Sequence, residues 1–270
     1  MYIHDFELTT GDQNVGTVYL PSKSATNLPV LIYCHGWGSS RFEDTRNLKI
    51  PSQQLCDRAI QENIAYVTFD FFGCGDTGGD YRDFTYSRWK NNLADVITWI
   101  ESQAFADKSK IACYGTSSGS TAVLRLIAED SRLCAAISNA SCITHHFAMN
   151  EGGPAKRFAD NVETLAAGNT TMAVGIDFGL EFFVDTISNA PMHTMSQIKC
   201  PVLFLQGQDD GIYRRLDAQL GYALMTEADC DNRTAYMPIE GGNHDLTNLP
   251  EVAAARVFEW LLPILEANSH

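Results

Sequence analysis

Near the middle of the chain, residues 115–119 read Gly-Thr-Ser-Ser-Gly between an apolar run at 111–114 and a helical pattern of apolar residues at 122–127. A serine hydroxyl becomes an effective nucleophile when the fold exposes it and a base removes its proton. A tight strand-to-helix turn exposes the hydroxyl, and glycines two positions before and after Ser117 let that turn close. The turn also directs the Ser118 amide and the positive end of the helix at one point. The pattern predicts Ser117 as a nucleophile, and a helix start that is merely rich in glycine and serine is the alternative interpretation.

The length and composition indicate a globular protein. With 270 residues and 45% hydrophobic content, the chain can form one large domain or two small ones, and we expect a single domain over residues 1–270. The formal net charge of −14 argues against binding to nucleic acid or to an anionic membrane. No apolar run is long enough to span a bilayer, and no secretory signal is visible in the first residues.

The eight cysteines bear on the compartment and on metal binding. Their even number is compatible with disulfides, but several stand within apolar, strand-like runs and none forms a Cys-x-x-Cys pair. These features favour buried thiols in a reducing compartment over disulfides, and they argue against a zinc site. We therefore expect a cytoplasmic protein without a metal.

Strand-like and helix-like segments alternate along most of the chain. The strands expected from short apolar or alternating runs are residues 2–9, 14–20, 29–34, 64–70, 110–114, 133–139, 201–206 and 234–239. Apolar residues at helical spacing indicate further helices over 89–100 and 252–265. The alternation predicts an α/β protein with a mostly parallel sheet of eight strands flanked by helices. Reactive groups should then gather at the carboxyl ends of the strands.

One segment, residues 141–198 between the sixth and seventh expected strands, breaks the alternation because it carries no clear strand. It is rich in flexible and aromatic apolar side chains: Phe147, Met149, Phe158, Met172, Phe178, Phe182, Phe183, Met192 and Met195. A connection of that length is unusual in a compact domain unless it has helices and a function of its own. We interpret it as an inserted helical cap that lines an apolar pocket. The alternative is additional helical packing without a role in substrate binding.

Two loops after strands offer partners for the serine. His244 lies in the glycine-rich loop 241–245 between the last strand and the last helix, where an imidazole can reach over the sheet edge and act as general base. Asp209 and Asp210 follow the seventh strand, and either carboxylate could orient the imidazole and stabilise its protonated form. The order Ser, Asp, His differs from the orders in chymotrypsin and subtilisin.

An oxyanion hole is the third requirement. Residues 34–38 read Cys-His-Gly-Trp-Gly after the third strand, where a loop amide should meet the amide beside the nucleophile. We expect the backbone N–H groups of Trp37 and Ser118 to be the donors. His35 is an alternative base, although it precedes the serine in the chain and lies in the loop that builds the hole. This chemistry needs no metal and no organic cofactor.

With these features the chain resembles the α/β-hydrolase superfamily over nearly its whole length. Residues 70–79 read DFFGCGDTGG, which is similar to the D-x-x-G-x-G-x-S motif after the fourth strand of many members. The continuation at 81–85, leading into a helix, resembles the bacterial cinnamoyl and feruloyl esterases, which also insert a helical cap between the sixth and seventh strands. In the family the acid usually lies three residues after a glycine that ends the seventh strand. The resemblance therefore assigns this role to Asp210, three residues after Gly207, and keeps Asp209 in reserve.

The chain departs from these relatives at two places. The elbow continues as Gly-Thr-Ser-Ser-Gly-Ser, where relatives often have Gly-His-Ser-Gln-Gly-Gly. The cap contains no tyrosine, although relatives that recognise phenols often bind the aromatic hydroxyl with polar cap residues. Asp177, Glu181 and Asp185 are the candidates to take that role here.

The expected function is hydrolysis of carboxylic esters through an acyl-enzyme on Ser117, with cinnamoyl, feruloyl or other small acyl esters as candidate substrates. A peptidase or amidase and a thioesterase of the same fold are alternatives, and a non-catalytic small-ligand receptor is a more distant one. The expected partner is a small-molecule ester, without nucleic acid or membrane. The sequence leaves the acyl and alcohol groups and the oligomeric state open.

Overall fold

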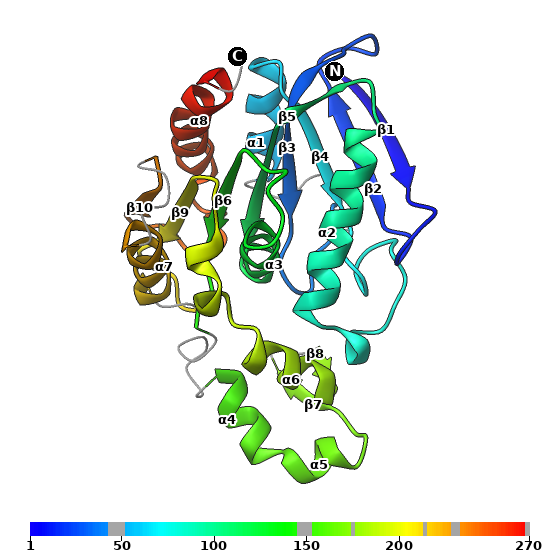
Figure 1. Ribbon diagram of the computed structural model, residues 1–270, viewed down its shortest axis with the longest axis vertical. Helices are drawn as coiled ribbons and strands as arrows, with labels where there is room; N and C mark the ends of the chain where they lie inside the picture. Colours follow the sequence, from blue (N-terminus) through cyan, green and yellow to red (C-terminus); the bar gives the residue numbers. More distant parts are fainter. Residues whose placement is uncertain (43–51, 145–152, 174–175, 213–214, 228–232, 268–270) are drawn as a thin grey trace.

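The computed structural model describes residues 1–42, 52–144, 153–173, 176–212, 215–227 and 233–267. Its main sheet has eight strands in the order β1-β2-β4-β3-β5-β6-β9-β10 (Figure 1). The strands are β1 (Tyr2–Glu7), β2 (Val15–Leu20), β3 (Leu28–Cys34), β4 (Ala65–Phe69), β5 (Ala106–Thr116), β6 (Ala135–Asn139), β9 (Val202–Gly207) and β10 (Ala235–Ile239). β2 runs antiparallel to both β1 and β4, and the remaining neighbours are parallel. The mostly parallel eight-stranded sheet predicted from the sequence is confirmed.

Helices cover both faces of this sheet. They are α1 (Ser52–Gln61), α2 (Tyr86–Glu101), α3 (Ser118–Ile127), α7 (Arg215–Glu227) and α8 (Pro250–Ala267). The apolar sides of α2, α3 and α7 form one core with the sheet, and those of α1 and α8 form the other. The central strands are buried on both faces, because every residue of β4 and β6 is shielded from solvent. This explains why these strands are almost continuously apolar in the sequence.

The segment between β6 and β9 stands beyond the end of the sheet (Figure 1). It contains α4 (Gly153–Asp160), α5 (Val162–Ala166), β7 (Thr171–Ala173), β8 (Ile176–Phe178), α6 (Leu180–Ser188) and two short 3₁₀ turns, η2 (Pro191–His193) and η3 (Met195–Gln197). The expectation that it carries no strand is wrong, because β7 and β8 pair in antiparallel fashion. Strands of three residues are too short to show an alternating pattern. Phe147 and Met149 lie outside the described residues.

Within the described parts of the chain, no cysteine forms a disulfide, whereas Cys230 lies outside them. Burial raises the pKa of the Cys56 thiol to about 12, as expected for a core thiol. Among the residues that the structure describes, no cluster of His, Cys, Asp and Glu has the make-up of a metal site. None of the described helices is both long enough and apolar enough to cross a membrane.

Candidate active site

Ser117 sits in a strained turn between β5 and α3. Its backbone has φ 53° and ψ −121°, a conformation that non-glycine residues rarely adopt. A Cβ atom placed on Gly115 would lie 2.6 Å from the Cα atom of Ser120, and one on Gly119 would lie 2.3 Å from the carbonyl oxygen of Cys34. Both glycines are therefore required by the close approach of backbone, as the Gly-x-Ser-x-Gly pattern predicts.

The structure separates the two candidate acids. Nδ1 of His244 lies 2.8 Å from Oδ2 of Asp210, whose side chain is only 1% exposed. The same carboxylate accepts hydrogen bonds from Nε2 of Gln206 at 2.7 Å and from the backbone N–H of Ile212 at 2.7 Å. Asp209 is exposed to solvent. The residue brought to the imidazole is thus Asp210.

The acid strand and the histidine loop are in direct backbone contact. A Cβ atom placed on Gly207, the last residue of β9, would lie 2.4 Å from the carbonyl oxygen of Gly242 and 2.3 Å from that of Asn243. Any larger residue at position 207 would therefore push the two loops apart. Gly207 therefore allows the loop that carries Asp210 to approach the loop that carries His244.

A polar network then joins the histidine loop to the serine turn. Asn139, at the end of β6, accepts the Ser117 N–H on its carbonyl oxygen at 3.0 Å and donates its side-chain amide to Oγ1 of Thr116 at 3.1 Å and to the carbonyl of His244 at 3.5 Å. Thr116 donates to Oδ1 of Asp245 at 3.2 Å, and that oxygen lies 3.8 Å from Nε2 of His244. Asn139 and Asp245 could not be recognised from the sequence, because Asn139 bonds to His244 and Asp245 bonds to Thr116, which are distant in the chain.

The loop expected to build the oxyanion hole passes directly beside the serine. A Cβ atom placed on Gly36 would lie 3.2 Å from Cβ and 3.6 Å from Oγ of Ser117. The buried His35 has Nδ1 2.8 Å from the carbonyl oxygen of Gly36, and its Nε2 accepts the backbone N–H of Phe71 at 3.2 Å. Since Nε2 is an acceptor, the proton is on Nδ1 and is donated to Gly36. His35 therefore braces this loop, and the geometry does not favour the alternative that it is the base.

The motif at 70–79 anchors the far side of the same loop. Asp70 is buried and accepts the backbone N–H of Arg41 at 2.6 Å and that of Asp76 at 2.9 Å, and it forms an ion pair with the Arg41 guanidinium. A Cβ atom on Gly75 would lie 2.2 Å from the Asp70 carboxylate, so a glycine is needed there. In this chain the motif connects the loop after β3 with the loop after β4.

The inserted segment packs on the loop at 35–38 through an aromatic cluster. The ring of Trp37 lies 5.0 Å from that of Phe178 and 5.5 Å from that of Phe182, measured between centroids. Phe178, Phe182 and Phe183 are all buried. For these three phenylalanines the structure therefore agrees with the alternative interpretation, in which they pack in the core and do not line a substrate pocket. Met172, in contrast, is 61% exposed.

A buried ion pair fixes α6 of the inserted segment to α3. Nη1 of Arg125 lies 2.7 Å from Oδ2 of Asp185, and the two side chains are 5% and 9% exposed. Ser87 donates its backbone N–H and its hydroxyl to the same carboxylate, and Asn189 donates its amide at 3.1 Å. Burial by itself raises the pKa of Asp185, but the charge of Arg125 and these hydrogen bonds hold the pKa below its ordinary value. Asp185 is therefore engaged in structure.

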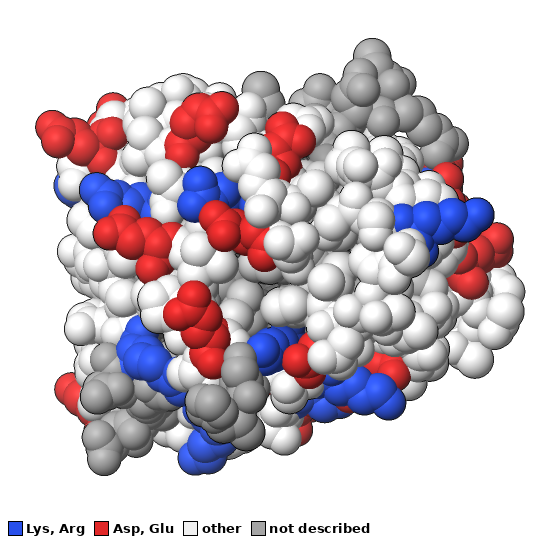
Figure 2. Space-filling view, turned by 90° about the horizontal axis from the view of Figure 1, so that it is seen from above, with Lys and Arg blue, Asp and Glu red and all other residues white. Residues whose placement is uncertain are grey.

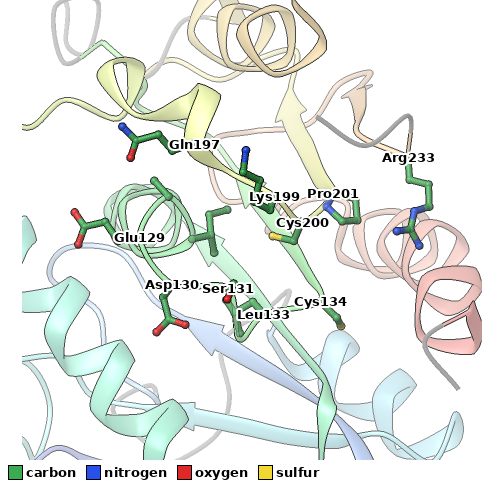
Figure 3. Close-up of a pocket in the computed structure, with 12 residues that line it drawn as sticks. Glu129, Asp130, Ser131, Leu133, Cys134, Gln197, Lys199, Cys200, Pro201 and Arg233 are labelled. Carbon is green, nitrogen blue, oxygen red and sulfur yellow. The ribbon is translucent and has the colours of Figure 1, made fainter. Parts of the chain in front are cut away.

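A separate cavity of about 320 Å³ lies at the amino ends of β6 and β9, opposite to the serine turn (Figure 3). Its walls include Glu129, Asp130, Cys134, Lys199, Cys200 and Arg233. The cavity is remote from Ser117 and does not belong to the candidate site.

On the face of the molecule opposite the inserted segment, basic and acidic side chains are interspersed (Figure 2).

The chain resembles known proteins in sequence and in fold. Residues 11–174 match the model of the family described as X-Pro dipeptidyl-peptidase (S15 family). An uncharacterised 31.7 kDa protein from the traX-finO intergenic region of Escherichia coli is 26% identical over 152 residues, which are 56% of this chain and 47% of that protein. The chain thus spans about half the length of these curated relatives.

Two solved structures share the fold. Est1E from Butyrivibrio proteoclasticus, solved with ferulic acid, superimposes with a TM-score of 0.74 at 16% identity, covering 95% of this chain and 98% of that one. The α/β-hydrolase GrgF from Penicillium sp. sh18 superimposes with a TM-score of 0.73 at 16% identity, covering 98% and 100%. The predicted α/β-hydrolase fold with its inserted segment is confirmed.

Proposed function

The chain belongs to the X-Pro dipeptidyl-peptidase (S15) family, and from that premise we propose that it is a serine hydrolase. The narrower proposal, that it cleaves carboxylic esters of small molecules, rests on the resemblance of residues 81–85 to the cinnamoyl and feruloyl esterases. The observation that carries the proposal is the 2.8 Å contact between His244 and the buried carboxylate of Asp210. The loop of His244 is joined to the serine turn by the hydrogen bond from Thr116 to Asp245. Because the buried carboxylate accepts the proton of Nδ1, the imidazole can take up a further proton on Nε2.

In the proposed mechanism Ser117 Oγ attacks the ester carbonyl while His244 Nε2 takes its proton. Asp210 stabilises the imidazolium, and the backbone N–H groups of Trp37 and Ser118 stabilise the oxyanion. The tetrahedral intermediate then expels the alcohol, which takes its proton from His244. Water, deprotonated by the same imidazole, attacks the acyl-enzyme and releases the carboxylic acid. No cofactor enters this scheme.

A peptidase or amidase is the second candidate, and the family match favours it, because the model describes a dipeptidyl-peptidase. The same groups would cleave an amide, with His244 protonating the departing amine. A dipeptide 4-nitroanilide with proline as second residue and 4-nitrophenyl esters of short acyl groups separate the two. The kcat/KM of each substrate is compared after correction for its uncatalysed rate of hydrolysis. A corrected kcat/KM for the esters at least about 100-fold above that for the anilide would favour the esterase. Thioesters belong in the same panel.

We further propose that the chain is one domain, 1–270, in which residues 141–198 form a cap that bounds the substrate site. The packing of Phe178 and Phe182 on Trp37 supports this, since the segment lies against the loop beside the serine. Feruloyl and cinnamoyl esters are narrower candidates for the substrate, supported by the resemblance of the 81–85 region and by the likeness in fold to Est1E.

A fluorophosphonate probe tests the proposal directly, because it forms a covalent bond with an activated serine. We expect labelling of the wild type at Ser117, and loss of both labelling and hydrolysis in Ser117→Ala with the fold intact. Ser120→Ala is the matched control, since Ser120 lies in the first turn of α3 and donates its hydroxyl to the Ser117 carbonyl at 2.8 Å. Labelling that persisted in Ser117→Ala would refute the assignment. Absence of any labelling in the wild type would favour the non-catalytic receptor.

A further inference from the structure

Tyr81 is the first residue of the 3₁₀ turn η1 (Tyr81–Asp83), which is separated from the motif at 70–79 by Asp80. Its hydroxyl accepts the backbone N–H of Gly38 at 3.0 Å and lies 2.9 Å from Sγ of Cys74. The turn itself is fixed, because the Asp80 carboxylate accepts the N–H of Arg82 at 2.9 Å. One phenol oxygen therefore joins the loop after β3 to the loop after β4.

Gly38 is the last residue of the loop that passes beside the serine. It has φ +65°, in the left-handed region that favours glycine, so the chain turns sharply there. The other end of the loop is held by His35, which donates to the carbonyl of Gly36. The peptide unit formed by the Gly36 carbonyl and the Trp37 N–H is thus held by His35 through its carbonyl, and the next peptide unit is held by Tyr81 through the Gly38 N–H.

The inserted segment covers the same point from outside. A Cβ atom on Gly38 would lie 4.0 Å from Cδ1 of Ile176 in β8, so this side chain rests against the loop. The ring of Tyr81 meets that of Phe178 edge-to-face, with centroids 6.3 Å apart. A Cβ atom on Gly179 would lie 2.7 Å from the carbonyl oxygen of Arg82, which shows how closely β8 approaches η1. Tyr81 stands where the three segments meet.

We propose that Tyr81 is a positioning residue that holds the loop at 35–38 so that the Trp37 N–H points at the oxyanion. The inference rests on the proposed function. Because the Gly38 N–H is already donated to Tyr81, that amide is engaged within the protein, and the preceding amide is the one offered to substrate. A donor in an oxyanion hole is effective only if it is held at the position where negative charge develops.

The hydroxyl keeps this role over the whole physiological pH range. Burial raises the pKa of Tyr81 far above its ordinary value, and burial raises the pKa of Cys74 to about 12. Both groups therefore stay protonated and neutral. The phenol oxygen can accept the Gly38 N–H while the contact with Cys74 is retained.

Tyr81→Phe tests the proposal, because it removes the hydroxyl and keeps the ring that packs on Phe178. With a 4-nitrophenyl ester we expect kcat to fall about 10-fold while KM stays within about twofold, since a misplaced oxyanion donor affects the transition state and not the ground state. Inhibition by phenylboronic acid, whose tetrahedral adduct places an oxygen in the hole, should weaken by about the same factor. Tyr222→Phe, at a half-buried tyrosine on α7, is the matched control and should change neither quantity.

A kcat for Tyr81→Phe within about twofold of the wild type would overturn the proposal. A rise in KM with kcat and phenylboronate inhibition unchanged would also overturn it, because Tyr81 would then contact substrate instead of positioning the loop. If Tyr81→Phe does not fold, Ile176→Ala provides the second test, since it loosens the loop from a partly exposed position and should lower kcat in the same way. Fluorophosphonate labelling of Ser117 in the wild type tests the proposed function separately.

Discussion

His244 and Asp210 face each other across two loops, with Nδ1 of the imidazole 2.8 Å from Oδ2 of the carboxylate. The Asp210 side chain is almost completely buried, whereas Asp209, one residue earlier, is exposed. Their different positions follow from the turn after β9, in which the Asp209 N–H is donated to the carbonyl of Gly242 at 2.9 Å and the next side chain is directed inward. Two adjacent carboxylates are thereby given different environments.

This relationship predicts unequal effects for two conservative changes. Asp210→Asn should lower kcat about 10³- to 10⁴-fold, because an amide cannot stabilise the imidazolium and favours the wrong tautomer. Asp209→Asn, in which the exposed side chain changes, should lower kcat less than about threefold. Steady-state kinetics with one 4-nitrophenyl ester decides the question. The reverse ranking would show that Asp209 supplies the acid and that the fold rearranges on binding.

The second prediction concerns the backbone contact behind the serine. Gly119→Ala should both destabilise the protein and abolish activity, because its methyl group would meet the carbonyl oxygens of Cys34 and His35 at 2.3 and 2.4 Å. We expect a loss of at least about 2 kcal/mol in the free energy of unfolding, from strain in a well-packed core. Gly78→Ala is the control, since that position is exposed and has no atom within 4 Å of an added Cβ. Equal effects of the two changes in urea denaturation would contradict the argument.

Asp185 provides the third prediction, on the attachment of the inserted segment. Asp185→Asn should lower the free energy of unfolding by about 3 kcal/mol or more, because it leaves the Arg125 charge buried without its counter-ion. Asp177→Asn, at an exposed position on β8, is the control and should change it by less than about 0.5 kcal/mol. Denaturant unfolding at neutral pH measures both.

The Asp185 carboxylate also makes the stability of the folded protein depend on pH, in a direction that can be predicted. The pKa of Asp185 is lowered in the folded protein, so the unfolded state takes up the proton first as the pH falls. Its stabilising contribution is therefore fully present above the unfolded pKa of about 3.9 and is lost as the pH drops through the folded pKa. The difference in stability between the wild type and Asp185→Asn should be constant above about pH 5 and shrink below about pH 4. A difference that grew toward acid pH would show that the sign is wrong.

The strands could be predicted from the sequence because they are buried on both faces and bounded by turns. Each expected strand of the main sheet overlaps an observed one. The helices α1 and α7 were not predicted. Their buried positions have helical spacing but are occupied partly by small or polar residues: Ser52, Leu55, Cys56 and Ala59 in α1, and Asp217, Ala218, Gly221 and Met225 in α7. Hydrophobic periodicity fails where a helix packs closely on a sheet through small side chains.

The part of the candidate site that stands in local sequence patterns could be predicted. Ser117 and His244 stand in loops whose glycines mark them, but the residues alone left Asp209 and Asp210 open. Asn139 has no local signature, and the resemblance of residues 81–85 gives no role to Tyr81, because the importance of both residues arises from partners such as His244 and Gly38 that are distant in the chain. Such residues are found only when the loops are seen together.

The last prediction concerns recognition of a phenol hydroxyl. Of the three carboxylates considered for that role, Asp185 is held by Arg125 and Ser87, and Asp177 and Glu181 are exposed at the surface of the inserted segment. An exposed carboxylate remains hydrated and gives little selectivity, whereas a buried polar group left without its partner can reject an analogue by about 10⁴-fold. We therefore expect methyl ferulate and its counterpart without the ring hydroxyl to differ by less than about 10-fold in kcat/KM. A preference for ferulate of about 10³-fold or more would contradict this and reveal a dedicated phenol site, which Glu181→Gln and Asp177→Asn would then locate.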